Sequence, residues 1–162
     1  MPARTLQELV STAASLHADR AAVLYDSGPG GTEASGSLLY SEVAQLSDGL
    51  AAVLLKNCCP SSGVIGLYCS DDLLVPVWIL GILQSSAAYV PLDPEAPGLL
   101  SARIMRQCGL KYCAVRRDLV QVEFLLFHLC ECSHTVLYKC IQTLWTFTDF
   151  VMLQPQTSMG SV

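Results

Sequence analysis

Between residues 41 and 115, segments with helical periodicity alternate with short runs that are apolar throughout. The run 64–69 has no polar interruption, which is typical of a strand covered on both faces in a parallel sheet. A second run, residues 88–92, follows after one helix-length segment. This alternation predicts an α/β fold in which right-handed helical crossovers connect the strands of a mostly parallel sheet. We expect strands 64–69 and 88–92 to be neighbours in that sheet.

Two capping signals mark the starts of the first helices. Thr5 and Glu8 have the spacing of a capping box, in which the Thr5 hydroxyl accepts the Glu8 N–H and the carboxylate bonds back to the Thr5 N–H. Apolar residues then recur at helical spacing to about His17. Ser41 is a candidate N-cap for a second helix, whose apolar face spans residues 43–54.

Two more helices follow from similar signals. Residues 70–72 place a capping side chain and negative charge at the start of a helix that ends near Gln84. Pro76 is expected to distort the early turns of that helix, because proline lacks an N–H. A further helix covers residues 99–108 and stops at Gly109.

Short apolar strands are also expected at residues 21–25, 37–40 and 111–115. The segment 26–36 holds four glycines and a proline, which predicts an exposed hairpin or loop. Residues 119–153 have neither caps nor a steady period, so a helix and a pair of strands both remain open there. We expect that segment to be less ordered and less tightly packed than residues 41–115. The polar residues 154–162 are expected to be disordered.

The chain is unusually apolar for its length. Hydrophobic residues make up 52% of the 162 residues and charged residues 14%, against about 25% charged in typical soluble domains. A piece of a larger protein, whose other part covers some of this surface, would have such a composition. A membrane span is not expected, because the most apolar stretch, residues 73–92, is interrupted by Pro76, Gly81 and Pro91.

Charge and cysteine content restrict the partners and the compartment. The net charge of −5 and the lack of a basic stripe argue against nucleic acid as a partner, since phosphate binding needs clustered Lys and Arg. Eight cysteines would suggest disulfides in a secreted protein, but the N-terminus has no signal-peptide pattern. We therefore expect reduced thiols that pack as small apolar groups, and a cytoplasmic location.

Two segments could be taken for ligand sites. Residues 28–32 are glycine-rich, but a phosphate loop needs Lys directly before Ser or Thr, so a surface turn is the better interpretation. Four potential zinc ligands alternate along the chain: His128, Cys130, Cys132 and His134. On one face of a strand they would lie about 6.6 Å apart, too far to converge on one tetrahedral ion, so unliganded residues are favoured.

Three further groups have structural interpretations. The vicinal cysteines at 58–59 are expected to pack, since adjacent cysteines rarely close a disulfide without strain. Asp71 and Asp72 are more simply helix-capping residues than a catalytic pair. Arg103 and Arg106 are expected on the solvated face of their helix. No catalytic, cofactor-binding or metal-ligating residue is assigned.

Two segments resemble a known family. Residues 39–43, Leu-Tyr-Ser-Glu-Val, resemble the early Leu-Thr-Tyr-x-Glu-Leu motif of adenylation domains. Residues 82–94 resemble the Leu-Lys-Ala-Gly-x-Ala-Tyr-Val-Pro-Ile-Asp-Pro motif that follows it, with Gln84 in place of Lys and Ser86 in place of Gly. The chain thus resembles the adenylate-forming, AMP-dependent synthetase/ligase family. Residues 5–10, 65–69 and 78–84 together look most like the β-alanine-activating branch of that family.

The resemblance implies a fold and an activity. The fold would be the N-terminal subdomain of an adenylation domain, incomplete, with a mostly parallel sheet flanked by helices. The full-length family member would use ATP and Mg²⁺ to convert a carboxylic acid, β-alanine or a related amino or fatty acid, into an acyl-adenylate. The acyl group would then pass to a phosphopantetheine thiol on a carrier domain, because AMP is a good leaving group.

The resemblance covers residues 5–115, and residues 116–162 form a divergent apolar segment and polar tail. The family's phosphate-binding loop, ribose-binding aspartate and C-terminal catalytic lysine are not found, so residues 1–162 alone are expected to be inactive and to bind no cofactor. Three interpretations stay open. They are an incomplete ligase, whether truncated, alternatively spliced or mispredicted; a non-catalytic interaction module with an apolar tail; and an independent nucleotide-binding α/β domain.

Overall fold

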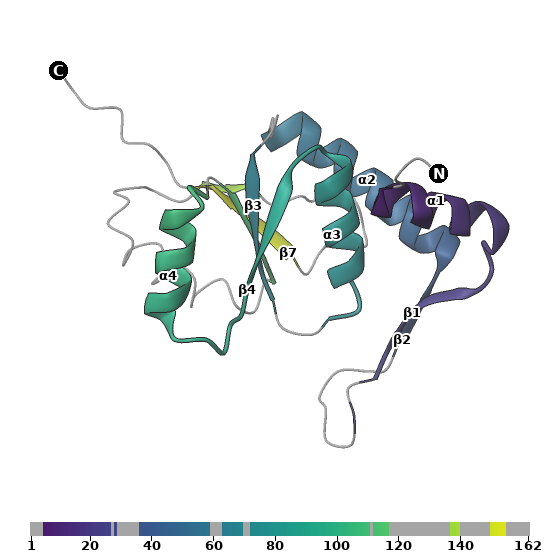
Figure 1. Ribbon diagram of the computed structural model, residues 1–162, viewed down its shortest axis with the longest axis horizontal. Coiled ribbons are helices and arrows are strands. Elements are labelled where there is room, and N and C mark those ends of the chain that lie inside the picture. Colours follow the sequence, from purple (N-terminus) through teal and green to yellow (C-terminus); the bar gives the residue numbers. More distant parts are fainter. Residues whose placement is uncertain are drawn as a thin grey trace. The chain divides into compact units, whose positions relative to one another are not determined.

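The computed structural model describes residues 5–26, 28, 36–58, 63–69, 72–110, 112–116, 137–139 and 150–154. The helices, in chain order, are α1 (Leu6–Leu16), α2 (Tyr40–Cys58), α3 (Val75–Gln84) and α4 (Gly98–Gln107) (Figure 1). The strands are β1 (Ala21–Tyr25), β2 (Gly36–Leu39), β3 (Val64–Tyr68), β4 (Ala88–Leu92), β5 (Tyr112–Arg116), β6 (Leu137–Lys139) and β7 (Phe150–Gln154). These elements group into a helical unit (α1, β1, β2, α2 and α3) and a sheet unit (β3, β4, α4, β5, β6 and β7).

Helix α1 begins with the predicted capping box. The Thr5 N–H donates to Glu8 Oε2 at 3.0 Å, and the Glu8 N–H donates to Thr5 Oγ1 at 3.2 Å. The helix ends at Leu16, close to the predicted end. None of its residues is buried, and Leu16 is 69% exposed, so α1 is a peripheral helix of its unit.

Strands β1 and β2 form the predicted hairpin as a two-stranded antiparallel sheet. Strand β1 has the predicted bounds, and β2 begins one residue earlier than expected, at Gly36. In the connection, Gly28 has a φ of +69°, and its N–H donates to Asp26 Oδ1 at 3.1 Å, which is turn geometry. Residues 27 and 29–35 lie outside the described part of the chain.

The start of α2 corrects one prediction. The helix begins at Tyr40, so Ser41 lies inside its first turn and is not the N-cap. The Ser41 hydroxyl instead donates to the carbonyl oxygen of Ala18, at 2.7 Å. Capping comes from Glu42, whose Oε2 accepts the Leu39 N–H at 2.8 Å. The Ser41 hydroxyl is thus used in a bond to a residue far away in the sequence. The free N–H group at the start of α2 is bonded by the Glu42 carboxylate instead.

The start of α3 corrects a second prediction. The helix begins at Val75, later than expected, and Pro76 is its second residue, where no intrahelical N–H bond is required. Pro76 therefore does not distort the helix. Asp72 Oδ1 accepts the Leu74 N–H at 2.7 Å, which caps the turn before the helix; Ser70 and Asp71 are not among the described residues. The predicted end at Gln84 is confirmed.

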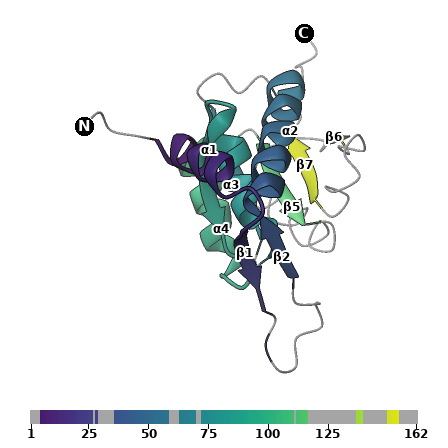
Figure 2. The same cartoon turned by 90° about the vertical axis from the view of Figure 1, so that its right-hand side faces the viewer.

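Helices α2 and α3 pack side by side, with α1 beside them (Figure 2). The closest approach is at Gly81, where an added Cβ would lie 2.7 Å from Leu50 Cδ2 and 2.8 Å from Leu50 Cγ. Leu50 is fully buried, as are Val77 and Trp78 on α3. Glycine at 81 therefore allows the two helices to approach more closely than any side chain would permit.

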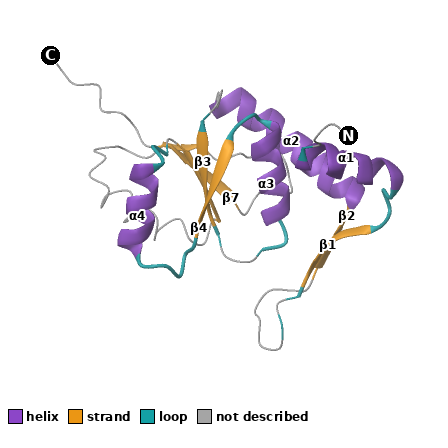
Figure 3. Ribbon diagram, in the orientation of Figure 1, coloured by secondary structure: helices purple, strands orange, loops and turns teal. Residues whose placement is uncertain are grey.

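The sheet unit has the strand order β4-β3-β5-β7-β6. Figure 3 shows β3, β4 and β7 of this sheet in orange. Strand β3 pairs in parallel with β4 and with β5, which confirms that the two apolar runs are adjacent. Strand β7 pairs antiparallel with β5 and with β6, so the sheet continues beyond its parallel part. The pairing of β7 was not predicted, because residues 119–153 lack a readable period.

Helix α4 covers one face of this sheet and closes the core. Met105 and Ala102 on α4 pack with buried side chains from three strands: Tyr68 on β3, Leu92 on β4, and Cys113 and Val115 on β5. The alternate residues of β3, Ile65 and Leu67, are buried as well, as expected for a strand covered on both faces.

The end of α4 is fixed by the predicted glycine. Gly109 has a φ of +59°, and its N–H donates to the Arg106 carbonyl oxygen at 3.2 Å. The Leu110 N–H donates to the Met105 carbonyl oxygen at 3.0 Å, which completes a Schellman motif. Leu110 and Met105 also share the core, so the cap and the packing support each other.

Most of the segment after residue 116 lies outside the described residues, and the predicted boundary at 115 and the expected disorder stay predictions. No helix in the described part of the chain is long and apolar enough to cross a membrane. Cys69, Cys108 and Cys113 form no disulfide, and the side chains of Cys58 and Cys59 are not described.

Replacing Gly81 with Ala should destabilise the chain. The new Cβ would overlap the inner atoms of Leu50, which cannot move without shifting α2, so we expect a net loss of about 1–2 kcal/mol despite the better helix propensity of Ala. Urea denaturation of Gly81→Ala, Leu50→Ala and the double variant tests this. An equal penalty for Gly81→Ala in both backgrounds would contradict the proposed overlap.

Ser86→Gly should stabilise the chain. Ser86 has a φ of +64° and is, among the described residues, the one non-glycine residue in the left-handed region. It stands where the resembled motif has a glycine. Removing its Cβ should relieve about 1 kcal/mol of backbone strain. Ser86→Ala keeps the Cβ and is the matched control, so a similar gain in both variants would show that φ strain is not the cause.

Candidate functional site

Ligands of open parallel sheets usually bind at the carboxyl ends of the strands. In the sheet unit, Tyr68 of β3 is aligned with Leu92 of β4 and with Val115 of β5. The residues that follow these three, Cys69, Asp93 and Arg116, therefore lie along one edge of the sheet. This edge is the first candidate site that the fold offers.

At this edge, the hydrogen bonds of Asp93 are those of a turn. Asp93 Oδ1 accepts the Glu95 N–H at 2.8 Å, and its carbonyl oxygen accepts the Ala96 N–H at 3.2 Å, so Asp93 forms the turn that leads to α4. Cys69 is half-buried, and the Arg116 side chain is not described.

Among the described residues, no three His, Cys, Asp or Glu side chains lie close enough together to hold a metal ion. Cys69 and residues 93–97, the described residues that directly follow β3 and β4, include no lysine, which nucleotide phosphates commonly require. No catalytic step is therefore assigned to the described side chains.

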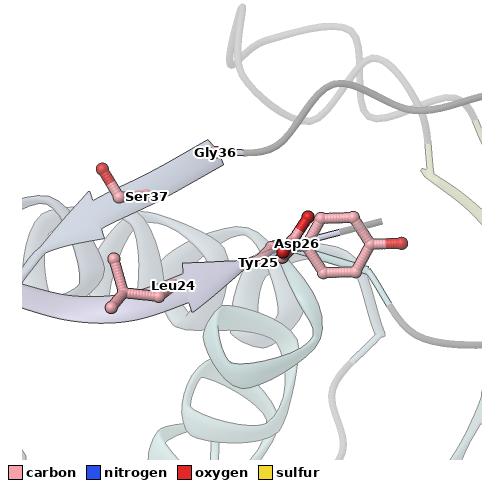
Figure 4. A pocket seen from close by; sticks show the side chains of 5 residues that line it. All are labelled: Leu24, Tyr25, Asp26, Gly36 and Ser37. Atoms are coloured by element: carbon pink, nitrogen blue, oxygen red, sulfur yellow. The ribbon is translucent and has the colours of Figure 1, made fainter. Parts of the chain in front are cut away.

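A second candidate is a hollow of about 480 Å³ at the end of the hairpin in the helical unit. Its lining consists of Leu24, Tyr25, Asp26, Gly36 and Ser37, and Figure 4 shows Leu24 and Ser37 extending from the two paired strands. The described lining includes one carboxylate and no cationic group. Gly28, beside this hollow, has turn geometry, and the remaining residues of the glycine-rich segment 28–32 lie outside the described part of the chain.

The other residues singled out from the sequence are not brought together. Arg103 and Arg106 are exposed on α4, as predicted. Asp72 caps a turn, and its neighbour Asp71 lies outside the described part. The four alternating residues at 128–134 also lie outside it, so the prediction that they bind no zinc stays untested.

Comparison with known proteins shows what the chain is related to. The sequence model of the family described as "AMP-binding enzyme" matches residues 10–160. The chain belongs to the AMP-binding enzyme family. It is 42% identical over 139 residues to the β-alanine-activating enzyme of Danio rerio, covering 83% of this chain and 12% of that protein. It is 31% identical over 116 residues to tyrocidine synthase 3 of Brevibacillus parabrevis, covering 72% of this chain and 2% of that protein.

Solved adenylation domains share this fold. The N-terminal subdomain of Klebsiella oxytoca NpsA matches with a TM-score of 0.61 at 18% identity, covering 70% of this chain and 28% of that one. The nonribosomal peptide synthetase FmoA3, solved with α-methyl-L-serine-AMP, matches with a TM-score of 0.63 at 23% identity, covering 75% of this chain and 13% of that one. The α/β fold of an adenylation N-terminal subdomain is thus confirmed, and the chain spans about an eighth of its curated relative from Danio rerio.

In this member of the AMP-binding enzyme family, the signature segment 82–94 is a structural element. It forms the end of α3, the turn at Ser86, strand β4 and the turn at Asp93. Leu92 is 2% exposed within the core. The described roles of this segment are therefore in packing and in turns.

One interaction in this segment was not predicted. The Gln84 side-chain Nε2 donates to Asp48 Oδ1 on α2 at 3.0 Å, while Gln84 Oε1 is buried without a hydrogen-bond partner. The residues are 36 positions apart in the chain, and their types carry no signal of the pairing. A lysine, typical of the resembled motif at this position, could make the same link without a buried acceptor.

Gln84→Lys should therefore stabilise the chain by about 1 kcal/mol. It removes the unsatisfied carbonyl oxygen, places an ammonium near the Asp48 carboxylate, and adds positive charge to the last residue of α3. Chemical denaturation of Gln84→Lys, with and without Asp48→Asn, measures how much of the gain in the free energy of unfolding is due to the ion pair. A gain that Asp48→Asn does not reduce would contradict the pairing.

Proposed function

We propose that the protein containing these residues activates a carboxylic acid with ATP as an acyl-adenylate, and that β-alanine is its leading candidate substrate. The observation that carries the proposal is the 42% identity over 139 residues to the β-alanine-activating enzyme of Danio rerio. The human enzyme of the same name is also 42% identical, over 130 residues. Related amino acids and fatty acids are the other substrates to be compared.

A carrier domain with a phosphopantetheine thiol is the proposed acceptor of the acyl group. Support comes from PA1221, a protein with adenylation and PCP domains, whose structure matches with a TM-score of 0.55 at 23% identity. That match supports the fold and makes a carrier partner a reasonable proposal. A cytoplasmic location is proposed with it, because ATP is the expected co-substrate.

The proposed role of these residues within the activity is structural. Strands β3, β4 and β5 with α4 form a packed core, and among the described residues no three metal-ligand side chains lie together. We propose that the groups that stabilise the departing pyrophosphate lie elsewhere in the protein. We infer that residues 1–162 by themselves do not form an adenylate.

A chimera tests this function. In the Danio rerio enzyme, the stretch that aligns with this chain is replaced by the residues of this chain, and β-alanine-dependent exchange of pyrophosphate into ATP is measured. We expect exchange within about tenfold of the parent enzyme, a loss of less than about 1.4 kcal/mol. Other amino acids and short fatty acids in place of β-alanine should give lower rates.

The controls separate folding from activity. The chimera with Gly66→Val should fail to fold, because a Cβ at Gly66 would lie 2.9 Å from Cys113 Sγ and 3.0 Å from Leu110 Cδ1. The isolated chain should show no exchange above a heat-inactivated sample. A chimera that melts like the parent but has lost β-alanine-dependent exchange would contradict the proposed substrate, and exchange by the isolated chain would contradict its proposed inactivity.

A further inference from the structure

Strand β4 forms one end of the sheet. It pairs with β3 in a continuous register from Val64↔Ala88 to Tyr68↔Leu92, without a bulge. On its other side, no strand in the described part of the chain pairs with it. Such an edge presents backbone N–H and C=O groups that can accept a strand from another molecule.

The backbone directions along β4 follow from one hydrogen bond. The Ala88 N–H donates to the carbonyl oxygen of Gly63, at 3.0 Å, and therefore points toward β3. Because successive residues of a strand point their N–H and C=O groups to opposite sides, Tyr89 and Pro91 direct these groups away from β3. Proline has no N–H, so Tyr89 is left as the outward donor within β4.

No other protective device is present in this strand. Between residues 73 and 92 the sequence contains no Asp, Glu, Lys or Arg, so β4 lacks the charged side chain that often protects an edge. Tyr89 and Val90 both favour extended structure. The strand also keeps a regular register, so it is not twisted away by a bulge.

We propose that Pro91 keeps the β4 edge from pairing with β4 of a second copy of this chain. In an antiparallel pair centred on Val90, Tyr89 of one copy lies opposite Pro91 of the other. The Tyr89 N–H could donate to the Pro91 carbonyl oxygen of the other copy. The second bond of this pair, from the N–H of residue 91 to the Tyr89 carbonyl oxygen, cannot form, and by symmetry it is missing twice. The pyrrolidine ring also occupies the space that the N–H would need.

The experiment replaces the proline and measures association. Pro91→Val supplies the missing N–H and a strand-favouring side chain, and its mass in sedimentation velocity should rise with concentration toward twice that of the monomer. Pro91→Lys supplies the same N–H but adds a charge that opposes pairing, so it should sediment like the unmodified chain. Pro97→Val is the matched control, because it makes the same substitution outside the strand, at the start of α4.

Two results would overturn the proposal. One is a Pro91→Val mass that stays equal to that of the unmodified chain at every concentration, and the other is equal association of Pro91→Val and Pro91→Lys. Hydrogen exchange on the unmodified chain gives a test that does not depend on any variant folding. The Tyr89 amide should exchange faster than the Val90 amide, which faces β3, and strong protection at Tyr89 would show that the edge is already paired.

Discussion

The parallel pairing of β3 with β4 and β5 is the constraint on which the sheet unit depends. At Gly66, in the middle of β3, the side chains of Cys113, Leu110 and Leu92 come so close that an added Cβ would lie 2.9–3.2 Å from them. These residues come from β5, the α4–β5 connection and β4, so three segments meet over one strand. The missing side chain at Gly66 lets that core close at normal packing density.

The helical unit depends on a comparable approach between α2 and α3 at Gly81. In both units, a glycine within a regular element leaves room for a large side chain from a neighbouring one. Neither glycine has a left-handed φ, so glycine is needed at these positions for close packing and not for backbone conformation. The sequence alone shows each only as a glycine within an apolar segment.

The segment 82–94, which resembles a motif of the family, contributes to packing and to turns. The signature segment contributes Leu92 to the core, Ser86 to a tight turn and Asp93 to the start of the next connection. Each of these roles is mechanical. Because parallel strands bring distant loops to a common edge, such a scaffold can position catalytic groups that the rest of a larger protein supplies.

The sequence by itself determined the elements whose signals are local. The capping box at Thr5, the strand bounds of β1 and β4 and the glycine that ends α4 could all be read from residues within a few positions of each other. The tertiary structure decided the rest. The Ser41 hydroxyl donates to the Ala18 carbonyl oxygen instead of capping α2. The Gln84 side chain donates to Asp48 on another helix, and β7 pairs with β5, which lies far away in the sequence. These interactions depend on which distant groups folding brings within hydrogen-bond distance, and residue type and spacing carry no record of that.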